Sequence, residues 1–244
     1  MSKVNADAIK PRDTGLDITL GATGDTTVIS ADSIDVNTVK DSGGNTLWSS
    51  DGAGTLSSVN SQLKGSEVLL STNTFSGTTT SNFTTKITSA YNVYIFRYNA
   101  INPETDDVQF TFQASIDGGS NYNVTMTTTA FRQYHYEDDT AATLNYQGSD
   151  DQGQGTAYQI LTDRAGSGAD ECGAGEIHLF NPASTVYIKH FYTTSQYYRV
   201  TQDGSEEEYI GGYFNTTSAI NAISFKMSSG NMDGKIRMYG MSTT

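Results

Sequence analysis

Apolar and polar residues alternate most regularly between Val108 and Ile116, where every second side chain is apolar and the ones between are Gln, Thr or Ser. Because successive side chains of an extended chain point to opposite faces, this pattern predicts a strand with one buried and one solvated face. Weaker versions of the pattern, bounded by turn residues, recur from Glu67 onward. They predict further strands at 67–72, 91–99, 121–129, 156–162, 175–180, 185–194, 208–215, 219–228 and 233–241.

The number and spacing of these strands predict the fold. About ten strands without a stretch of sustained helical periodicity favour an all-β protein, with an antiparallel β-sandwich of jelly-roll type over residues 67–244. The glycine-containing turns 117–121 and 228–234 are each expected to join two neighbouring strands as a hairpin. Two Gly- and Asp-rich segments, 148–155 and 165–175, are predicted to be exposed, mobile loops.

The composition supports this prediction. Only 17% of residues are charged and 36% are hydrophobic, and the chain has only three prolines. Thr, Ser, Gly and Asn fill much of the remainder, as expected for short strands joined by polar turns.

Residues 1–54 differ from the rest, because their apolar residues come in short bursts between turn-rich pieces. Such strands cannot offset an ordering cost of roughly 1–2 kcal/mol per residue unless another surface covers them. We therefore expect a thin β-rich shaft or anchoring arm, covered by neighbouring copies or by a different protein. A disordered arm is the alternative. The residues predicted to contact the partner are Leu16, Ile18, Ile34, Val36 and Trp48.

A short neck is predicted at 55–66, between this region and the sandwich. Leu56, Val59 and Leu63 fall at the i, i+3 and i+7 spacing of a narrow apolar seam on a helix, and Gly65 follows as a stop. Two turns of helix need packing to persist, so the seam predicts an oligomer contact. An extended linker remains an alternative, since Ser and Asn are indifferent helix formers.

Charge and hydropathy exclude several classes of function. The formal net charge of −13 would repel nucleic-acid phosphates and anionic lipid. No apolar run approaches the roughly 20 residues that span a bilayer, and the N-terminus has no apolar signal core. We therefore expect neither nucleic-acid binding nor membrane insertion, and synthesis without an export signal.

No motif for catalysis, a cofactor or zinc emerges. Cys172 is the sole cysteine, and His135, His178 and His190 lie on separate predicted elements without ligand spacing. The carboxylates cluster on what are predicted to be solvated loops, at 106–107, 137–139, 150–151 and 206–208. Calcium at 137–139 or 150–151 is a minor alternative, because hard oxygen ligands on loops suit it.

Aromatic residues near predicted loops are the remaining candidates for recognition. Tyr134, Tyr136, Tyr197 and Tyr198 lie where they could stack on a sugar or be buried in a partner. Core packing is the alternative for each.

Several short blocks follow one another along residues 67–244: Glu67–Thr74, Phe83–Thr84, Tyr91–Tyr94, Pro103–Asp106, Phe112–Ser120, Ile223–Asn231 and Met238–Gly240. In order and spacing, these blocks resemble the β-sandwich module found repeatedly in virion structural proteins of tailed bacteriophages, especially marine ones. The resemblance covers about 67–244 and implies a virion-associated protein that forms fibres or appendages or decorates the capsid.

The leading hypothesis is a non-enzymatic virion protein, made in the host cytoplasm, that forms a homotrimeric tail fibre or tail appendage. Its N-terminal region is expected to attach to other virion proteins, and its sandwich to face solvent, a neighbour or a host glycan. A capsid decoration or head-fibre protein is the alternative, followed by a depolymerase acting on surface polysaccharide, which would need two carboxylates converging in a groove.

Overall fold

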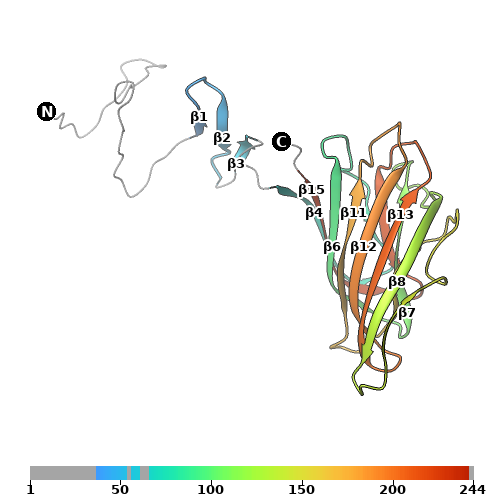
Figure 1. Cartoon of the computed structure of the whole chain (residues 1–244). Coiled ribbons are helices and arrows are strands. Elements are labelled where there is room, and N and C mark those ends of the chain that lie inside the picture. The colour runs from blue at the N-terminus through green and yellow to red at the C-terminus, as the bar shows by residue number, and fades with distance from the viewer. Residues whose placement is uncertain (1–36, 54–55, 61–65, 242–244) are drawn as a thin grey trace, which may run out of the picture. The chain divides into compact units, whose positions relative to one another are not determined.

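The computed structural model describes residues 37–53, 56–60 and 66–241, and within them all regular secondary structure is β-strand (Figure 1). The chain divides into two units, residues 1–58 and 59–244. The expected all-β fold is confirmed.

The first unit contributes a small three-stranded sheet, with strand order β1-β2-β3. Its strands are β1 (Thr38–Lys40), β2 (Thr46–Ser50) and β3 (Leu56–Val59), the last of which runs into the second unit. The β1–β2 turn is held by Asp41, whose Oδ1 accepts hydrogen bonds from the backbone N–H of Gly43 at 2.9 Å and of Asn45 at 2.8 Å. Among residues 37–60, every side chain whose exposure is described is half-buried or exposed, so this sheet has no core of its own.

The second unit is a β-sandwich built on the strand order of a jelly roll. One layer contains β4-β15-β6-β11 and the other contains β5-β14-β7-β10, and the chain crosses between the layers at nearly every step. The eight strands are β4 (Glu67–Thr78), β5 (Ser81–Phe83), β6 (Val93–Pro103), β7 (Val108–Ser115), β10 (Gln159–Ala165), β11 (Gly173–Phe180), β14 (Ala222–Met227) and β15 (Met232–Met241).

Two antiparallel hairpins extend the first layer beyond β11. The hairpin of β12 (Lys189–Arg199) and β13 (Gly204–Phe214) pairs with β11, and the hairpin of β8 (Met126–Tyr136) and β9 (Ala142–Tyr146) pairs with β13. The enlarged layer therefore has the order β4-β15-β6-β11-β12-β13-β8-β9, and its central strands lie side by side in Figure 1.

The two layers are nearly closed into one sheet. On one side, Ala165 of β10 is opposite Arg199 of β12. On the other, the Asn73 side chain on β4 donates hydrogen bonds of 3.1 Å to Ser81 Oγ and to the Asn82 carbonyl. Only the hairpin strands beyond β12 project past this closure.

The core between the layers is rich in phenylalanine. Phe110 and Phe225 stack with their ring centroids 5.8 Å apart, and Phe83 meets Phe96 edge to face at 5.4 Å. Phe110 alternates with polar residues along β7, so the pattern of period two places it in the interior as predicted. Ile177, Leu179, Ile236 and Met238 complete this part of the core.

Two turns expected to form hairpins do not. Gly118 and Gly119 adopt positive φ as a tight turn requires, but β7, before the turn, pairs with β14 and β10 and not with β8. The turn before β15 likewise joins strands of different layers. Both turns carry the chain from one layer of the sandwich to the other. A glycine-rich turn permits either a hairpin within a layer or a crossing between layers, so the turn residues did not distinguish the two.

Candidate functional site

The inserted hairpins carry two polar arrangements, one on each face of the enlarged layer. Alternation along β8 sends Arg132, Tyr134 and Tyr136 toward the interior and Gln133 and His135 outward. Alternation along β13 likewise buries Glu206 and Glu208 and leaves Glu207 half-buried on the outer face.

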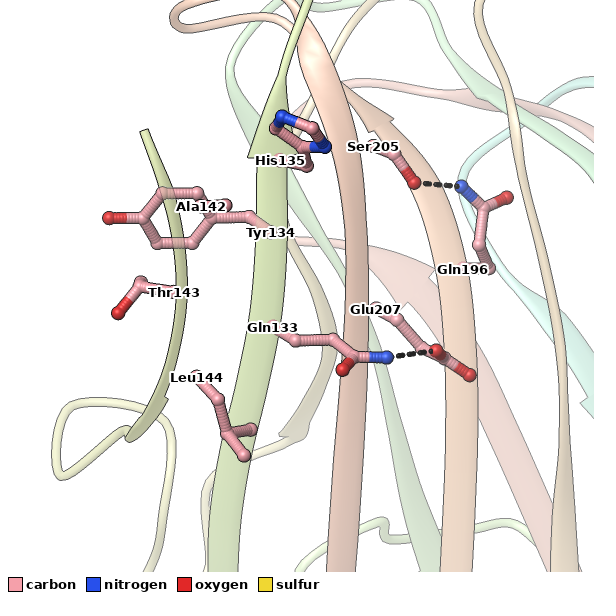
Figure 2. Close-up of a pocket in the computed structure, with 9 residues that line it drawn as sticks. All are labelled: Gln133, Tyr134, His135, Ala142, Thr143, Leu144, Gln196, Ser205 and Glu207. Carbon is pink, nitrogen blue, oxygen red and sulfur yellow. Dashed lines mark hydrogen bonds between the residues drawn. The ribbon is translucent and has the colours of Figure 1, made fainter. Parts of the chain in front are cut away.

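The outer face holds a shallow groove of about 350 Å³ (Figure 2). Gln133 Nε2 donates a 2.7 Å hydrogen bond to Glu207 Oε2, and Gln196 Nε2 donates a 3.3 Å bond to Ser205 Oγ. The groove offers amide, hydroxyl and carboxylate groups beside an exposed leucine. These groups suit the binding of a hydroxyl-rich or peptide ligand better than they suit catalysis. Its lining is Gln133, Tyr134, His135, Ala142, Thr143, Leu144, Gln196, Ser205 and Glu207.

Exposed apolar side chains continue along this face. Phe131 stacks on Tyr209 of the neighbouring strand with ring centroids 4.9 Å apart and planes 11° from parallel. Tyr146 of β9 lies opposite Phe131 on its other side. Phe131 and Tyr146 are 45% and 58% exposed, so this row presents apolar area on the outer face.

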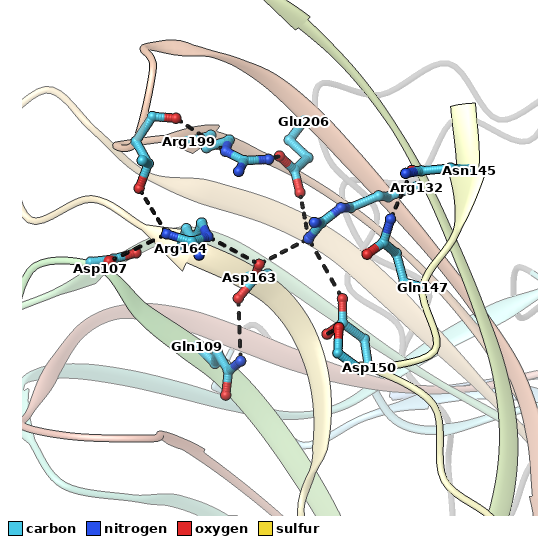
Figure 3. Close-up of polar contacts among 12 residues, drawn as sticks. Asp107, Gln109, Arg132, Asn145, Gln147, Asp150, Asp163, Arg164, Arg199 and Glu206 are labelled. Atoms are coloured by element: carbon cyan, nitrogen blue, oxygen red, sulfur yellow. Dashed lines mark hydrogen bonds and ion pairs between the residues drawn. The ribbon is translucent and has the colours of Figure 1, made fainter. Parts of the chain in front are cut away.

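The inner face holds a buried ionic cluster centred on Arg132 (Figure 3). Its Nη1 lies 2.8 Å from Asp163 Oδ2, 3.1 Å from Glu206 Oε1 and 3.6 Å from Asp150 Oδ2. Burial works against the charged guanidinium, but the hydrogen bond to Asp163 and the charge of Glu206 outweigh it and raise the pKa of Arg132. Three carboxylates from different segments are thereby held to one cation.

Arg199 and Tyr197 complete the coordination of Glu206. Arg199 Nη1 donates to Glu206 Oε2 at 2.6 Å, and the Tyr197 hydroxyl donates to Oε1 at 2.7 Å. The same hydroxyl accepts the backbone N–H of Asp163 at 2.9 Å. Burial first, and then the charges of Glu206 and Glu208, raise the pKa of Tyr197 well above its ordinary value, so this hydroxyl keeps its proton.

Glu208 differs from its neighbours because neither of its carboxyl oxygens meets a donor among the described residues. Its side chain is fully buried, and burial, followed by the charge of Asp150, raises its pKa to about 9. This raised pKa favours the uncharged form of Glu208 at neutral pH.

The converging carboxylates of this cluster are enclosed. Asp150, Glu206 and Glu208 are 4%, 1% and 0% exposed, so a polysaccharide does not reach them in this conformation. The expectation that 150–151 and 206–208 are solvated loops is wrong for these three residues, because 206–208 lies within β13 and Asp150 folds inward beneath β8.

The four predicted recognition tyrosines fall in different environments. Tyr197 is fully buried, so the prediction of surface recognition is wrong for it. Tyr134 and Tyr136, half-buried on the inner face, stack at 4.8 Å, and the Arg199 guanidinium carbon lies 5.5 Å and 5.8 Å from their ring centroids. Tyr198 is half-buried on the outer face, and burial together with a hydrogen bond to Asp203 raises its pKa to about 12. A role in recognition stays a prediction for Tyr134, Tyr136 and Tyr198.

The predicted attachment and neck residues are only partly described. Trp48 is half-buried on β2, whereas Leu16, Ile18, Ile34, Val36 and Leu63 lie outside the described residues. Leu56, which is 54% exposed, and Val59 belong to strand β3, so the helical seam is wrong at these two positions and the extended alternative holds. Their role in an oligomer stays a prediction.

Sequence analysis did not single out Arg132 or Asp163 of this cluster, and it placed Glu206 and Glu208 on a solvated loop. An available signal was alternation: Arg132, Tyr134 and Tyr136 share one face, as do Glu206 and Glu208, once strands are extended through them. The strand predicted at 121–129 ended before Arg132, and the strand predicted at 208–215 began after Glu206. Neither predicted strand therefore contained the full pattern.

The described part of the chain has neither a metal-ligand cluster nor a helix that could span a membrane. No three His, Cys, Asp or Glu side chains there converge as a metal site, and Cys172 is an exposed free thiol. No helix capable of crossing a bilayer is found among those residues.

Comparison with known protein families, with curated proteins and with solved structures finds no match to this chain. Its function must therefore be argued from its own residues.

Proposed function

We propose that this chain is a non-enzymatic structural protein of a tailed-bacteriophage virion, forming a trimeric, fibre-like tail appendage. Residues 1–54 attach it to other virion proteins, and the sandwich is the outward-facing head. The outer groove beside β9 is the surface that meets a host glycan.

The observation that carries this proposal is the uncovered sheet of the first unit. Strands β1–β3 have at most five residues each, and none of their described side chains is buried. A sheet of this kind does not repay its ordering cost alone, so cover from identical copies or from another protein accounts for it. Three copies wound together would provide that cover symmetrically.

The sandwich supports a binding and scaffolding role over hydrolysis. A glycosidase needs two carboxyl groups roughly 5–10 Å apart on either side of an accessible bond. Here the carboxylates that converge are held by Arg132 inside the sandwich, whereas the outer groove offers Glu207 beside amides. The resemblance of residues 67–244 to phage virion modules points to the same role.

The test uses hydrogen exchange on the full chain, free in solution and assembled in particles. Residues 37–60 are expected to exchange at least tenfold more slowly in the particle, because assembly covers their strands. Light scattering of the free chain should give three times the chain mass. A monomer whose residues 37–60 are already fully protected would overturn the proposal.

A reconstruction of the intact particle decides the location. Density for the sandwich at the tail supports the appendage, and density over capsid sites would replace it with a decoration protein.

A further inference from the structure

We propose that two copies of this chain pair edge to edge through β9, joining their enlarged layers into one continuous sheet across a two-fold axis. This proposal does not depend on the phage assignment. It rests on the backbone and side chains of Ala142–Tyr146.

The backbone of β9 has an open side. The Tyr136 N–H donates to the Ala141 carbonyl at 3.0 Å, and the Gln147 N–H donates to the Ala130 carbonyl at 2.9 Å. The β8–β9 register between these bonds has no shift, so odd-numbered residues of β9 bond to β8. The N–H and C=O groups of Ala142, Leu144 and Tyr146 therefore point away from β8, and no other described residue bonds to them.

This edge lacks the features that usually prevent pairing. Natural edge strands are protected by charged residues, proline, bulges or a covering segment. Residues 140–149 contain no charge and no proline, the register with β8 is unbroken, and all five side chains of β9 are exposed. By contrast, the opposite edge strand, β4, is tied to β5 through Asn73.

The side chains fit a second copy in one register. An antiparallel two-fold centred on Leu144 places this residue opposite itself and Tyr146 opposite Ala142 of the second copy. All three lie on the outer face, so the pairs are leucine with leucine and a large ring with a small methyl. On the other face, Thr143 meets Asn145 of the second copy, which pairs hydroxyl with amide.

Charge favours this patch over the rest of the surface. The chain carries a net charge of −13, so two copies repel each other generally, but the uncharged run 140–149 provides an edge where they can approach. Under this two-fold, Asp138 and Asp139 of one copy would come near Asp151 of the other. The pairing should therefore be weak at low ionic strength and stronger when salt screens these acids.

The interface is small, which sets the conditions of the test. Two five-residue strands bury far less than the roughly 1,600 Å² of a standard interface. Sedimentation of the full chain in about 0.5 M salt first gives the mass of the species present at low protein concentration. As the protein concentration rises, this mass should double. In about 0.02 M salt the doubling should need at least tenfold more protein.

A charge exchange at position 144 tests the register. L144K and L144E are each expected to weaken doubling at least tenfold, because the two-fold places like charges opposite one another. Mixing the two variants should restore it, since Lys then faces Glu. Circular dichroism verifies that both variants are folded, and Y192K, which alters an exposed tyrosine on a strand remote from this edge, should double like the unmodified chain.

Three results would overturn the proposal: no doubling of the unmodified chain at millimolar concentration, doubling that survives in L144K and L144E alone, or a mixture no better than either variant. The second result would place the contact on another surface, and the third would exclude the two-fold register. The test measures a doubling in mass of whichever species is present at low protein concentration. Its outcome is therefore independent of whether that species is the trimer of the proposed function.

Discussion

Glu208 and Asp150 bring two carboxyl groups against each other in the interior of the sandwich, and neither Glu208 oxygen nor Asp150 Oδ2 accepts a hydrogen bond from another described residue. Two carboxylates in this position would repel each other. A proton on Glu208 removes the repulsion and supplies the missing donor, which adds to the larger effect of burial in raising its pKa to about 9. The cluster around Arg132 therefore includes one neutral acid.

Replacing Glu208 by Gln should make the folding stability less dependent on pH. An acid whose pKa rises from 4.5 to about 9 on folding costs stability progressively between those values, because only the unfolded chain releases the proton. The advantage of E208Q over the unmodified chain should grow by up to about 1.4 kcal/mol per pH unit across this range. Urea unfolding of both chains at pH 5, 7 and 9 measures it.

The control for this experiment is E207Q, which removes a carboxylate from the outer face of the same strand. Its difference from the unmodified chain should stay within about 0.5 kcal/mol, as for most surface changes. An E208Q advantage that is the same at pH 5 and pH 9 would show that Glu208 is already ionised in the folded protein.

Removing the central cation should be much more costly than removing a peripheral one. In R132M, the half-buried Asp163 and the fully buried Glu206 lose their shared partner, and breaking a buried pair costs about 3–5 kcal/mol. R164M removes a guanidinium that is 41% exposed and lies 3.6 Å from the carboxylates of Asp107 and Asp163. The expected loss in the free energy of unfolding is therefore below about 1 kcal/mol. Denaturant unfolding at pH 7 compares them, and equal losses would contradict the central role of Arg132.

Tyr197 offers a test of one buried hydroxyl. In Y197F the ring still fills its position, but Glu206 Oε1 loses a donor and the Asp163 N–H loses its acceptor. Leaving these groups unsatisfied should cost about 1–3 kcal/mol in the free energy of unfolding. Y198F, on the outer face of the same strand, should change it by less than about 0.5 kcal/mol. A Y197F chain as stable as Y198F would mean that water replaces the hydroxyl.

The strands of the jelly roll were predictable because their burial follows local alternation. Val108–Ser115 differs from the predicted strand by one residue at its end. β9 was not predicted although Ala142, Leu144 and Tyr146 alternate with polar residues, because the pattern spans only five residues, and β5 has only three residues.

Local sequence patterns could not predict which strands pair or which residues form the ionic cluster. Gly118 and Gly119 indicate a turn, but not whether the next strand lies beside the last or in the opposite layer. Arg132 and Glu206 are 74 residues apart in sequence, and neither neighbourhood reveals the other. The tyrosines show the same limit, because Tyr197 and Tyr198 are adjacent, yet only alternation within a correctly bounded strand shows which one is buried.

Two neighbouring glycines of β13 should respond oppositely to the same small change. A methyl group on Gly212 would lie 2.6 Å from both the Thr127 carbonyl oxygen and Thr128 Cγ2, so the β8–β13 pairing must shift to admit it. On Gly211 the nearest described atom would be Thr129 Oγ1, at the ordinary contact distance of 3.8 Å. We expect G212A to lose about 1–3 kcal/mol as an overpacked site and G211A to be neutral or to gain up to about 1 kcal/mol, because alanine restricts the unfolded chain. Thermal unfolding of the two variants tests this, and a stable G212A would show that β8 and β13 are farther apart in solution.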